Sequence, residues 1–381
     1  MSDRRKISIA SPSMGEDEIR ALREVVESGW LTQGPKVSEF EIAFAEHHRV
    51  DYAVAVTSCT AGLHLALVGL GVGPGDEVIV PAFTWVATAN AVLYTGAEPV
   101  LADVDRTTFN IDVADVKRRI GPRTRAVIPV HLFGLCADID SLKDIIPKDV
   151  TIIEDAACAA GAEYKGRRAG GLGHVGVFSF HPRKSITTGE GGMITTDDSD
   201  LASHLRRLRD HGANISDEQR HSGSKPYLMP EFDELGFNCR MTDLQGAVGL
   251  VQLDKLDRFI NERKQWSAYY RRELADLGWL RLPEEPETGR HAWQAFVTYV
   301  NPETAPKPRN EIMTALEAAG VATRPGTHAV HQLGHYRKRF GFSDDDFPGA
   351  RDCAADSMAL PLHNRMTDED YERVVESIRN L

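Results

Sequence analysis

A lysine set between two short apolar runs is the first residue of this chain that could do chemistry. Lys184 follows the run 175–180 and precedes the glycine-rich stretch 187–192, after which a second run extends over 193–196. This pattern predicts a tight turn between two strands. Burial at the tip of such a turn would lower the pKa of the amine and prepare it to form a Schiff base. Most lysines are surface residues, so Lys184 alone does not decide the chemistry.

Asp155 is the second such residue. It ends the predicted strand 151–155, in which three β-branched residues precede Glu154 and Asp155. An acid at the carboxyl end of a strand lies at the edge where α/β sheets bind their ligands. A buried carboxylate needs a cationic or hydrogen-bonding partner. Either the protonated pyridine nitrogen of a cofactor or an arginine side chain would supply one.

Hydroxyl residues at the start of a predicted helix form a third polar group. Strand 52–56 is followed by the sequence TSCT at 57–60 and then by a helix with apolar residues over 63–70. Backbone N–H groups and hydroxyls at a helix start can bind an anion, although an ordinary N-cap is the commoner role for Ser and Thr there. The aromatic segment 83–85 follows strand 77–80 at the same ligand-binding edge.

The composition bounds the class of protein. The chain has 381 residues, 42% of them hydrophobic and 26% charged, and a net charge of −12. This acidity argues against nucleic acid as the main partner. Five cysteines without a CxxC pair argue against a disulfide framework and against a zinc site. We expect a cytoplasmic protein with no membrane partner and no metal, because neither a signal peptide nor a membrane-spanning run is visible.

The remaining pattern predicts alternating strands and helices. Ser13 and Glu16 fit a capping box for a first helix, which we expect Gly29 to end. Further strands are expected at 99–104 and 126–130. Together with the strands named above, these predict an α/β fold built on one sheet.

A long helix divides the chain into two expected domains. A capping box at 242–245 opens this helix, which leads from a larger domain over 1–254 into a smaller one over 255–381. In the smaller domain, a helix at 310–319 and a final helix from Asp368 suggest an α+β layer. The polar segment 211–237, with its two prolines, predicts a long loop.

Motifs along nearly the whole chain resemble those of the DegT/DnrJ/EryC1/StrS sugar aminotransferases, which are fold type I enzymes that use pyridoxal 5′-phosphate (PLP). In order they are GWLTQGP (29–35), TSCTAGLHLAL (57–67), GPGDEVIVPAFTWVATANAV (73–92), VHLFG (130–134), EDAACAAGA (154–162), SFHPRKSITTGEGGMI (179–194), GFNCRMTDLQGAVGLVQL (236–253) and LPLH (360–363). The ordered series is far more specific than any single glycine motif. The resemblance implies a large α/β/α domain with a mostly parallel central sheet, a smaller C-terminal α+β domain, and PLP as the cofactor.

The resemblance implies a role for each cofactor-facing residue. Lys184 matches the lysine that holds PLP as a Schiff base and then moves a proton between the substrate Cα and the cofactor C4′. Asp155 matches the acid that keeps the pyridine nitrogen protonated. Trp85 matches the aromatic side chain that stacks on the ring.

Phosphate contacts carry over in the same way. Thr60 and the Ala61 backbone N–H match the phosphate site at the helix start, together with the Ser179 hydroxyl. Asn238 matches a residue that reaches the phosphate of the neighbouring subunit. This match implies a homodimer with shared active sites.

Substrate contacts are implied at four further positions: Thr32, Arg240, Arg324 and His328. In this family L-glutamate usually donates the amine, and a keto sugar that is usually linked to a nucleoside diphosphate accepts it. A carboxylate donor and a diphosphate both need cationic or N–H contacts, for which Arg183, Arg240 and Arg324 are candidates. The SFHP turn at 179–182 favours nucleotide sugars, with a 4-keto-6-deoxyhexose as the first choice.

Two departures from the family pattern are informative. Cys158 stands where many members have Gln or His to hydrogen-bond the phenolic oxygen of the cofactor. A thiol is a weak donor, so that contact is either missing here or supplied by water. Relatives with His in place of the Schiff-base lysine act as 3-dehydratases on 4-keto sugars. The presence of Lys184 argues against that chemistry.

Three rival functions differ in what they require of the sequence. A transaminase acting on a keto-cyclitol would share every cofactor residue and stays open. A catalytically silent PLP-binding regulatory protein would be favoured by loss of Lys184 or Asp155, and both are present. A dinucleotide-binding protein would need a GxGxxG turn after its first strand, where this chain has TSCTAG at 57–62.

Overall fold

The protein is described by a computed structural model over residues 5–215, 227, 229–287 and 289–381. Part of the expected loop 211–237 lies outside these residues. Within them, no helix is long and apolar enough to cross a membrane. The same residues contain no group of three or more His, Cys, Asp or Glu side chains that could hold a metal ion.

Seven strands form the central sheet in the order β1-β10-β9-β6-β5-β2-β4. Neighbours from β9 to β4 are parallel, whereas β10 is antiparallel to both β1 and β9. Their bounds are β1 Tyr52–Val56, β2 Glu77–Pro81, β4 Glu98–Ala102, β5 Thr124–Val127, β6 Thr151–Asp155, β9 Val175–Ser179 and β10 Gly192–Thr196. The mostly parallel sheet and its expected strands are confirmed, although β4 and β5 end earlier than the apolar pattern indicated.

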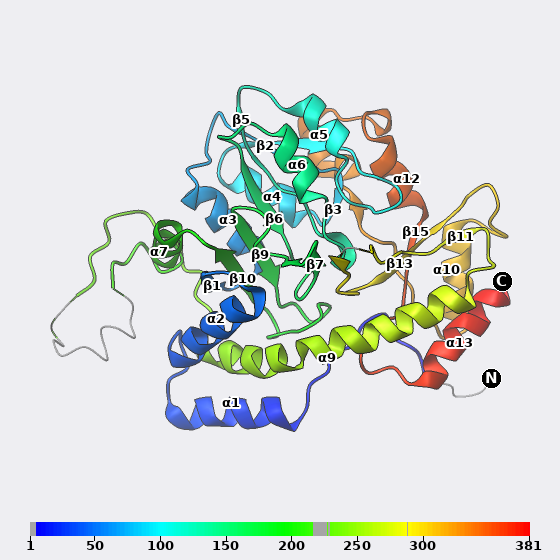
Figure 1. Ribbon diagram of the computed structural model, residues 1–381, viewed down its shortest axis with the longest axis horizontal. Coiled ribbons are helices and arrows are strands. Elements are labelled where there is room, and N and C mark those ends of the chain that lie inside the picture. The colour runs from blue at the N-terminus through cyan, green and yellow to red at the C-terminus, as the bar shows by residue number, and fades with distance from the viewer. Residues whose placement is uncertain (1–4, 216–226, 228, 288) are drawn as a thin grey trace.

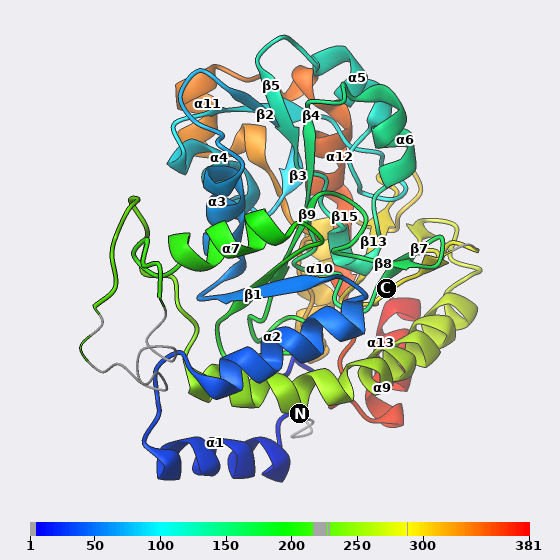
Figure 2. The same ribbon diagram turned by 60° about the vertical axis from the view of Figure 1, so that its left-hand side comes forward.

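Helices cover both faces of this sheet (Figures 1 and 2). Within the described residues up to 273, the α-helices are α1 Glu16–Ser28, α2 Pro35–His48, α3 Cys59–Gly69, α4 Ala87–Tyr94, α5 Val113–Arg119, α6 Ile139–Ile145, α7 Ser199–Leu208 and α9 Asp243–Glu273. α3, α4 and α7 share one core with alternate strand residues such as Val54 and Val56, whereas α2 and α9 pack on the opposite face against Ala53 and Ala55. α5 and α6 extend that second face. The side-chain alternation of each strand thus produces the expected α/β/α layers.

A three-stranded antiparallel sheet forms the smaller unit at the right of Figure 1, in the order β11-β13-β15. The elements that follow α9 along the chain include β11 Leu280–Arg281, β13 Phe296–Val300, α10 Arg309–Ala318, η2 Val330–Gln332, α11 Gly334–Phe340, η3 Asp344–Asp346, α12 Pro348–Asp356, β15 Ser357–Leu360 and α13 Asp368–Arg379. Of these, η2, α11 and α12 pack on the core of the larger unit through Val330, Tyr336 and Ala350. Helices α10 and α13 and the end of α9 pack on the sheet to form a separate core. The expected helices near 310 and 368 are confirmed.

Short pairings link the two halves. β14 (His328–Ala329) pairs with β3 (Phe83–Thr84), and β12 (Gly289–Arg290) pairs with β7 (Glu163–Tyr164), which in turn pairs with β8 (Arg167–Arg168). The short helix η1 covers Leu132–Gly134. The expected division at residues 254 and 255 falls inside the continuous helix α9 and stays a prediction.

Helix α1 lies outermost and packs on α9 rather than on the sheet (Figure 2). The expected capping box of Ser13 and Glu16 is wrong. The helix begins at Glu16, and Glu18 accepts a hydrogen bond from the Gly15 N–H at 2.8 Å, so the cap lies two residues later in the chain. Gly29, with φ of 75°, ends the helix as expected. The second capping box, formed by Thr242 and Gln245 at the start of α9, is confirmed.

Candidate active site

Lys184 lies on the loop 180–191, which joins strands β9 and β10 and which we call the lysine loop. The Lys184 N–H donates to the carbonyl of His181 at 2.8 Å, and Thr187 Oγ1 donates to the Phe180 carbonyl at 2.7 Å. Gly191 has a φ of 156°, and a Cβ there would meet Thr188 Oγ1 at 2.4 Å. The predicted glycine-punctuated turn is therefore present, and its own hydrogen bonds hold the lysine in place.

The Lys184 amine contacts the sulfur of Cys158. Its Nζ donates to Cys158 Sγ at 3.2 Å. Burial favours the neutral amine, but the Cys158 and Cys59 thiols and the Asp155 carboxylate act in the opposite direction and leave the pKa of Lys184 above its ordinary value. The expected lowering of this pKa is therefore wrong for the protein alone, because the sequence did not show how many negative or polarisable groups surround the amine.

Asp155 is 5% exposed at the end of β6. Its Oδ2 accepts from Thr88 Oγ1 at 2.7 Å, and its Oδ1 accepts from the Ala157 N–H at 3.2 Å and from Cys59 Sγ at 3.9 Å. Among the residues that the structure describes, no arginine forms an ion pair with it, so the arginine alternative finds no support. A buried acid that lacks a paired cation is suited to hold a protonated ring nitrogen.

The start of helix α3 lies next to the lysine loop. Gly192 pairs with Val56 of β1 and with Ser179 of β9, and a Cβ on Gly192 would meet the Ser58 and Cys59 backbone at 2.6–2.7 Å. Ser179 is therefore beside the helix start, which fits a phosphate site that Ser179 shares with Thr60. The ordinary N-cap is present as well, because Ser58 Oγ accepts from the Ala61 N–H at 3.1 Å.

Trp85 and His328 are brought together by the pairing of β3 with β14. His328 is opposite Thr84 in that pairing, and its ring lies 5.4 Å from the Trp85 ring in an edge-on arrangement. Trp85 is 59% exposed, which leaves its face free for a ligand. Arg324 is exposed and pairs through its backbone with Ala359 of β15.

A lysine, a buried acid, a helix start and an exposed aromatic ring thus converge at one edge of the sheet, and this donor set fits PLP. The model of the DegT/DnrJ/EryC1/StrS aminotransferase family matches residues 12–379. The chain belongs to this family.

Relatives of the aminotransferase agree with that assignment. It is 40% identical to the spore coat polysaccharide biosynthesis protein SpsC of Bacillus subtilis, over 97% of this chain and 95% of the relative. It is also 40% identical to the GDP-perosamine synthase of Caulobacter vibrioides, over 99% of both chains. Spr1654 of Streptococcus pneumoniae, assigned as a sugar aminotransferase and solved in its PLP form, has a TM-score of 0.90 and 29% identity over 98% of both chains. The protein is a PLP-dependent sugar aminotransferase of fold type I.

Three predicted site residues of the aminotransferase have other partners within the described part of the chain. The Thr32 carbonyl accepts from the Asp243 N–H at 3.1 Å, Asn238 bridges to the backbone of Asp210, and the Arg240 guanidinium forms an ion pair with the Asp210 carboxylate. None of the three forms a hydrogen bond or ion pair with Lys184 or Asp155 in those residues. Their roles stay predictions.

Thr88 has a contact in the site that was not predicted from the sequence, although it stands inside the quoted motif 73–92. Its place in the first turn of α4, three residues after Trp85, brings its hydroxyl to Asp155. The sequence does show a hydroxyl residue near the ligand-binding edge. Only the fold, however, shows that the start of α4 lies against the end of β6.

We expect Thr88→Val to lower kcat about fivefold, because Asp155 loses a hydrogen bond that fixes its carboxylate, worth about 1 kcal/mol. Steady-state kinetics measures the effect. Thr95→Val is the matched control, since that hydroxyl bonds the Val92 carbonyl at the other end of the same helix. Equal activity of the two variants would show that Thr88 does not orient the acid.

Glu154, the other acid of β6, faces away from Asp155 and has a structural role. It is fully buried and accepts from the N–H groups of Gly170, Leu172 and Gly173 at 2.6–2.7 Å. His131 Nε2 lies 2.8 Å from its remaining side. Glu154 therefore holds the turn before β9 and takes no part in cofactor binding.

Glu154→Gln is expected to lower the free energy of unfolding by about 3 kcal/mol. The side-chain amide puts an NH₂ donor where a carboxylate oxygen accepted hydrogen bonds, so buried backbone N–H groups lose their acceptor. Urea unfolding of the variant and the wild type measures the difference. An unfolding midpoint unchanged from the wild type would contradict this structural role.

We expect Cys158→Gln to keep activity within about tenfold of the wild type, since an amide can replace the weak contact of a thiol at a cost or gain of about 1 kcal/mol. The kcat with L-glutamate and a keto sugar tests this. Complete loss of turnover would show that the thiol has an essential function.

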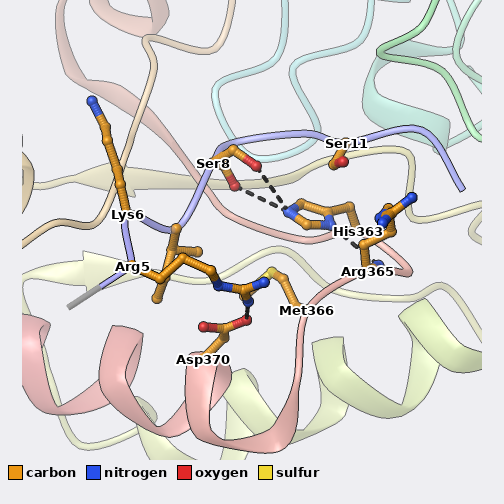
Figure 3. Close-up of a pocket in the computed structure, with 9 residues that line it drawn as sticks. Arg5, Lys6, Ser8, Ser11, His363, Arg365, Met366 and Asp370 are labelled. Carbon is orange, nitrogen blue, oxygen red and sulfur yellow. Dashed lines mark hydrogen bonds and ion pairs between the residues drawn. The ribbon is translucent and has the colours of Figure 1, made fainter. Parts of the chain in front are cut away.

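A cavity away from these residues lies between the N-terminal segment and the start of α13 (Figure 3). It has a volume of about 250 Å³ and includes none of the predicted site residues. Arg5 is paired with Asp370, and burial lowers the pKa of His363 to about 4, so its ring is neutral at pH 7. The cavity marks the place where the N-terminal segment is anchored to the smaller unit.

Proposed function

We propose that the enzyme transfers the amino group of L-glutamate to a nucleotide-linked keto sugar, most simply the C4 ketone of a 4-keto-6-deoxyhexose. The observation that carries this proposal is that Lys184 and Asp155 lie close enough at the sheet edge to interact electrostatically. The similarity of the chain to a GDP-perosamine synthase over 99% of its length supports the choice of substrate. The relatives named above give the keto-cyclitol alternative no comparable support.

PLP, when bound, supplies an electron sink for the carbanion that forms at the reacting carbon. We assign to Asp155 the task of holding a proton on the ring nitrogen, because its buried carboxylate lies at the ligand edge of the sheet. Lys184 would hold and move a proton at its Nζ beside the reacting carbon. Ser179 and Thr60 would bind the phosphate, and Trp85 would cover the ring.

Cationic side chains near the site are suited to the two anionic substrates. Arg183 directly precedes Lys184, and Arg324 lies on the segment that leads to His328. Both are exposed, and neither guanidinium forms an ion pair within the described ranges. Arg240 is held by Asp210, so binding substrate through Arg240 requires this ion pair to open. We therefore assign the substrate carboxylate and diphosphate first to Arg183 and Arg324.

We also propose a homodimer with shared active sites, in which Asn238 contacts the phosphate bound by the other subunit. Large apolar side chains are exposed on one chain, among them Leu31, Ile42 and Tyr94, in keeping with a covered surface. Mixing the inactive variants Lys184→Ala and Asn238→Ala tests the sharing. Recovery of part of the activity in the mixture supports it, and no recovery contradicts it.

The cytoplasm is the proposed location, because all five cysteines are free thiols, as is usual in a reducing compartment.

The experiment that tests the substrate is incubation of the PLP-loaded enzyme with L-glutamate and a GDP-linked 4-keto-6-deoxyhexose, with product masses measured over time. Conversion of the ketone to an amine supports the proposal. Conversion of a keto-cyclitol, with no reaction of any nucleotide-linked ketone, would replace it by the alternative. No transfer from any amino donor would favour a catalytically silent PLP-binding protein.

A further inference from the structure

Cys158 and Lys184 form a pair that the amino-transfer reaction does not require. Cys158 lies in the turn after β6, which is fixed by hydrogen bonds from the Ala156 N–H to Val177 and from the Ala159 N–H to Ala156. Its sulfur accepts from Lys184 Nζ at 3.2 Å. Both residues keep part of their surface exposed, so a small oxidant can reach them.

The surroundings of Cys158 differ from those of the other cysteines. Burial raises the pKa of the Cys59, Cys136 and Cys239 thiols, and it raises that of Cys353 to about 12. These four are therefore held as thiols, which react slowly with peroxides. Cys158 instead lies in direct contact with the amine of Lys184, at 3.2 Å.

We propose that Cys158 and Lys184 form a reversible sulfur–nitrogen cross-link when the protein without PLP meets a peroxide, and that this modification controls cofactor loading. The evidence for the cross-link is the contact between the two side chains. Its effect on loading rests on the proposed role of Lys184 as the residue that binds PLP.

The chemistry takes two steps. The Cys158 sulfur attacks hydrogen peroxide, the O–O bond breaks, and the sulfur is oxidised to a sulfenic acid while the peroxide is reduced to water. The Lys184 ammonium gives up one proton, and the lone pair of the neutral amine attacks this sulfur; an S–N bond forms, the S–O bond breaks, and the hydroxyl leaves as water with a second proton from the nitrogen. The proton released before the attack passes to solvent. Excess thiol reverses the link by reducing the S–N bond back to the thiol and the amine.

Cofactor binding protects the pair. Once PLP has engaged Lys184, the amine is no longer available to the oxidised sulfur. The state that can be cross-linked is therefore the protein that has not yet taken up PLP, and oxidation would hold it in that state until a thiol reductant restores it.

The test treats PLP-free and PLP-loaded protein with hydrogen peroxide, then measures the intact mass, the peptide map and the uptake of PLP by its absorbance. We expect the PLP-free protein to lose the mass of two hydrogen atoms and to give a linked peptide pair containing Cys158 and Lys184. Its capacity for PLP should fall in proportion to the linked fraction, and dithiothreitol should restore it. The loaded protein should show no link.

Matched variants separate this link from a disulfide, which changes the mass by the same amount. Cys59→Ser keeps the link if it joins Cys158 to Lys184, whereas a Cys59–Cys158 disulfide would disappear. Lys184→Arg should lose the link and leave a sulfenic acid at Cys158 that dimedone traps. Cys158→Ser should show neither product.

Addition of oxygen at Cys158 without any linked peptide would overturn the proposal, as would loss of the link in Cys59→Ser. A link that forms without any effect on PLP uptake would overturn the control of loading. If instead the protein never binds PLP covalently, the proposed role of Lys184 fails, while the peptide map still decides the cross-link.

Discussion

Replacement of Lys184 by alanine is expected to abolish amino transfer. The variant lacks the amine of the lysine loop, which is the group that moves the proton. Loss of a general acid–base group typically lowers kcat by about 10²- to 10⁴-fold. PLP should still bind, without a covalent bond, through Asp155, Trp85 and the helix start. Steady-state kinetics measures the loss, and borohydride reduction followed by mass analysis should attach PLP to the wild type only.

The control for this variant is Lys143→Ala, which removes an exposed lysine of α6. It should keep wild-type turnover and covalent PLP. Turnover retained in Lys184→Ala would contradict the assignment of Lys184. Covalent attachment of PLP to that variant after reduction would place the cofactor on another lysine.

Asp155→Asn should have the second largest effect. The amide can still accept the hydrogen bond that Thr88 Oγ1 donates at 2.7 Å, so the local packing is kept. It carries no charge to hold a proton on the pyridine nitrogen, and the ring becomes a poorer electron sink. Loss of one preorganised electrostatic contact of this kind lowers kcat by about 10²- to 10³-fold. Single-turnover measurements with L-glutamate should show the slower step directly.

Glu154 provides an internal comparison for Asp155, because the two acids are adjacent on β6. Asp155→Asn should reduce activity with little change in unfolding, whereas Glu154→Gln should reduce stability. A variant of Asp155 that loses stability but keeps its rate would contradict the distinction drawn between the two carboxylates.

The sheet, the helices on its faces and the lysine loop could be predicted because their patterns are local. Short apolar runs mark the strands, and glycines mark the turn that carries Lys184. The first capping box was wrong because Ser13 and Glu16 have the right spacing, yet Glu18 forms the cap with Gly15. Spacing alone does not distinguish two registers that differ by two residues.

The surroundings of the lysine could not be predicted in the same way. The contact of Lys184 with Cys158 and the bond from Thr88 to Asp155 join segments that are far apart in the sequence. Burial was predicted from the apolar run, but the pKa of Lys184 also depends on Cys158, Cys59 and Asp155, which come from two other segments. Such contacts are set by the packing of β6, β9 and α4 rather than by any one pattern.

The central claim, that Lys184 and Asp155 form a PLP site that accepts an amino group, is tested most directly by visible absorption of the purified protein. Spectra are recorded with PLP before and after addition of L-glutamate. We predict a yellow protein whose colour bleaches with L-glutamate and returns when a keto sugar is added. A protein that takes up no PLP colour would contradict the site, and a colour that no amino donor bleaches would contradict amino transfer.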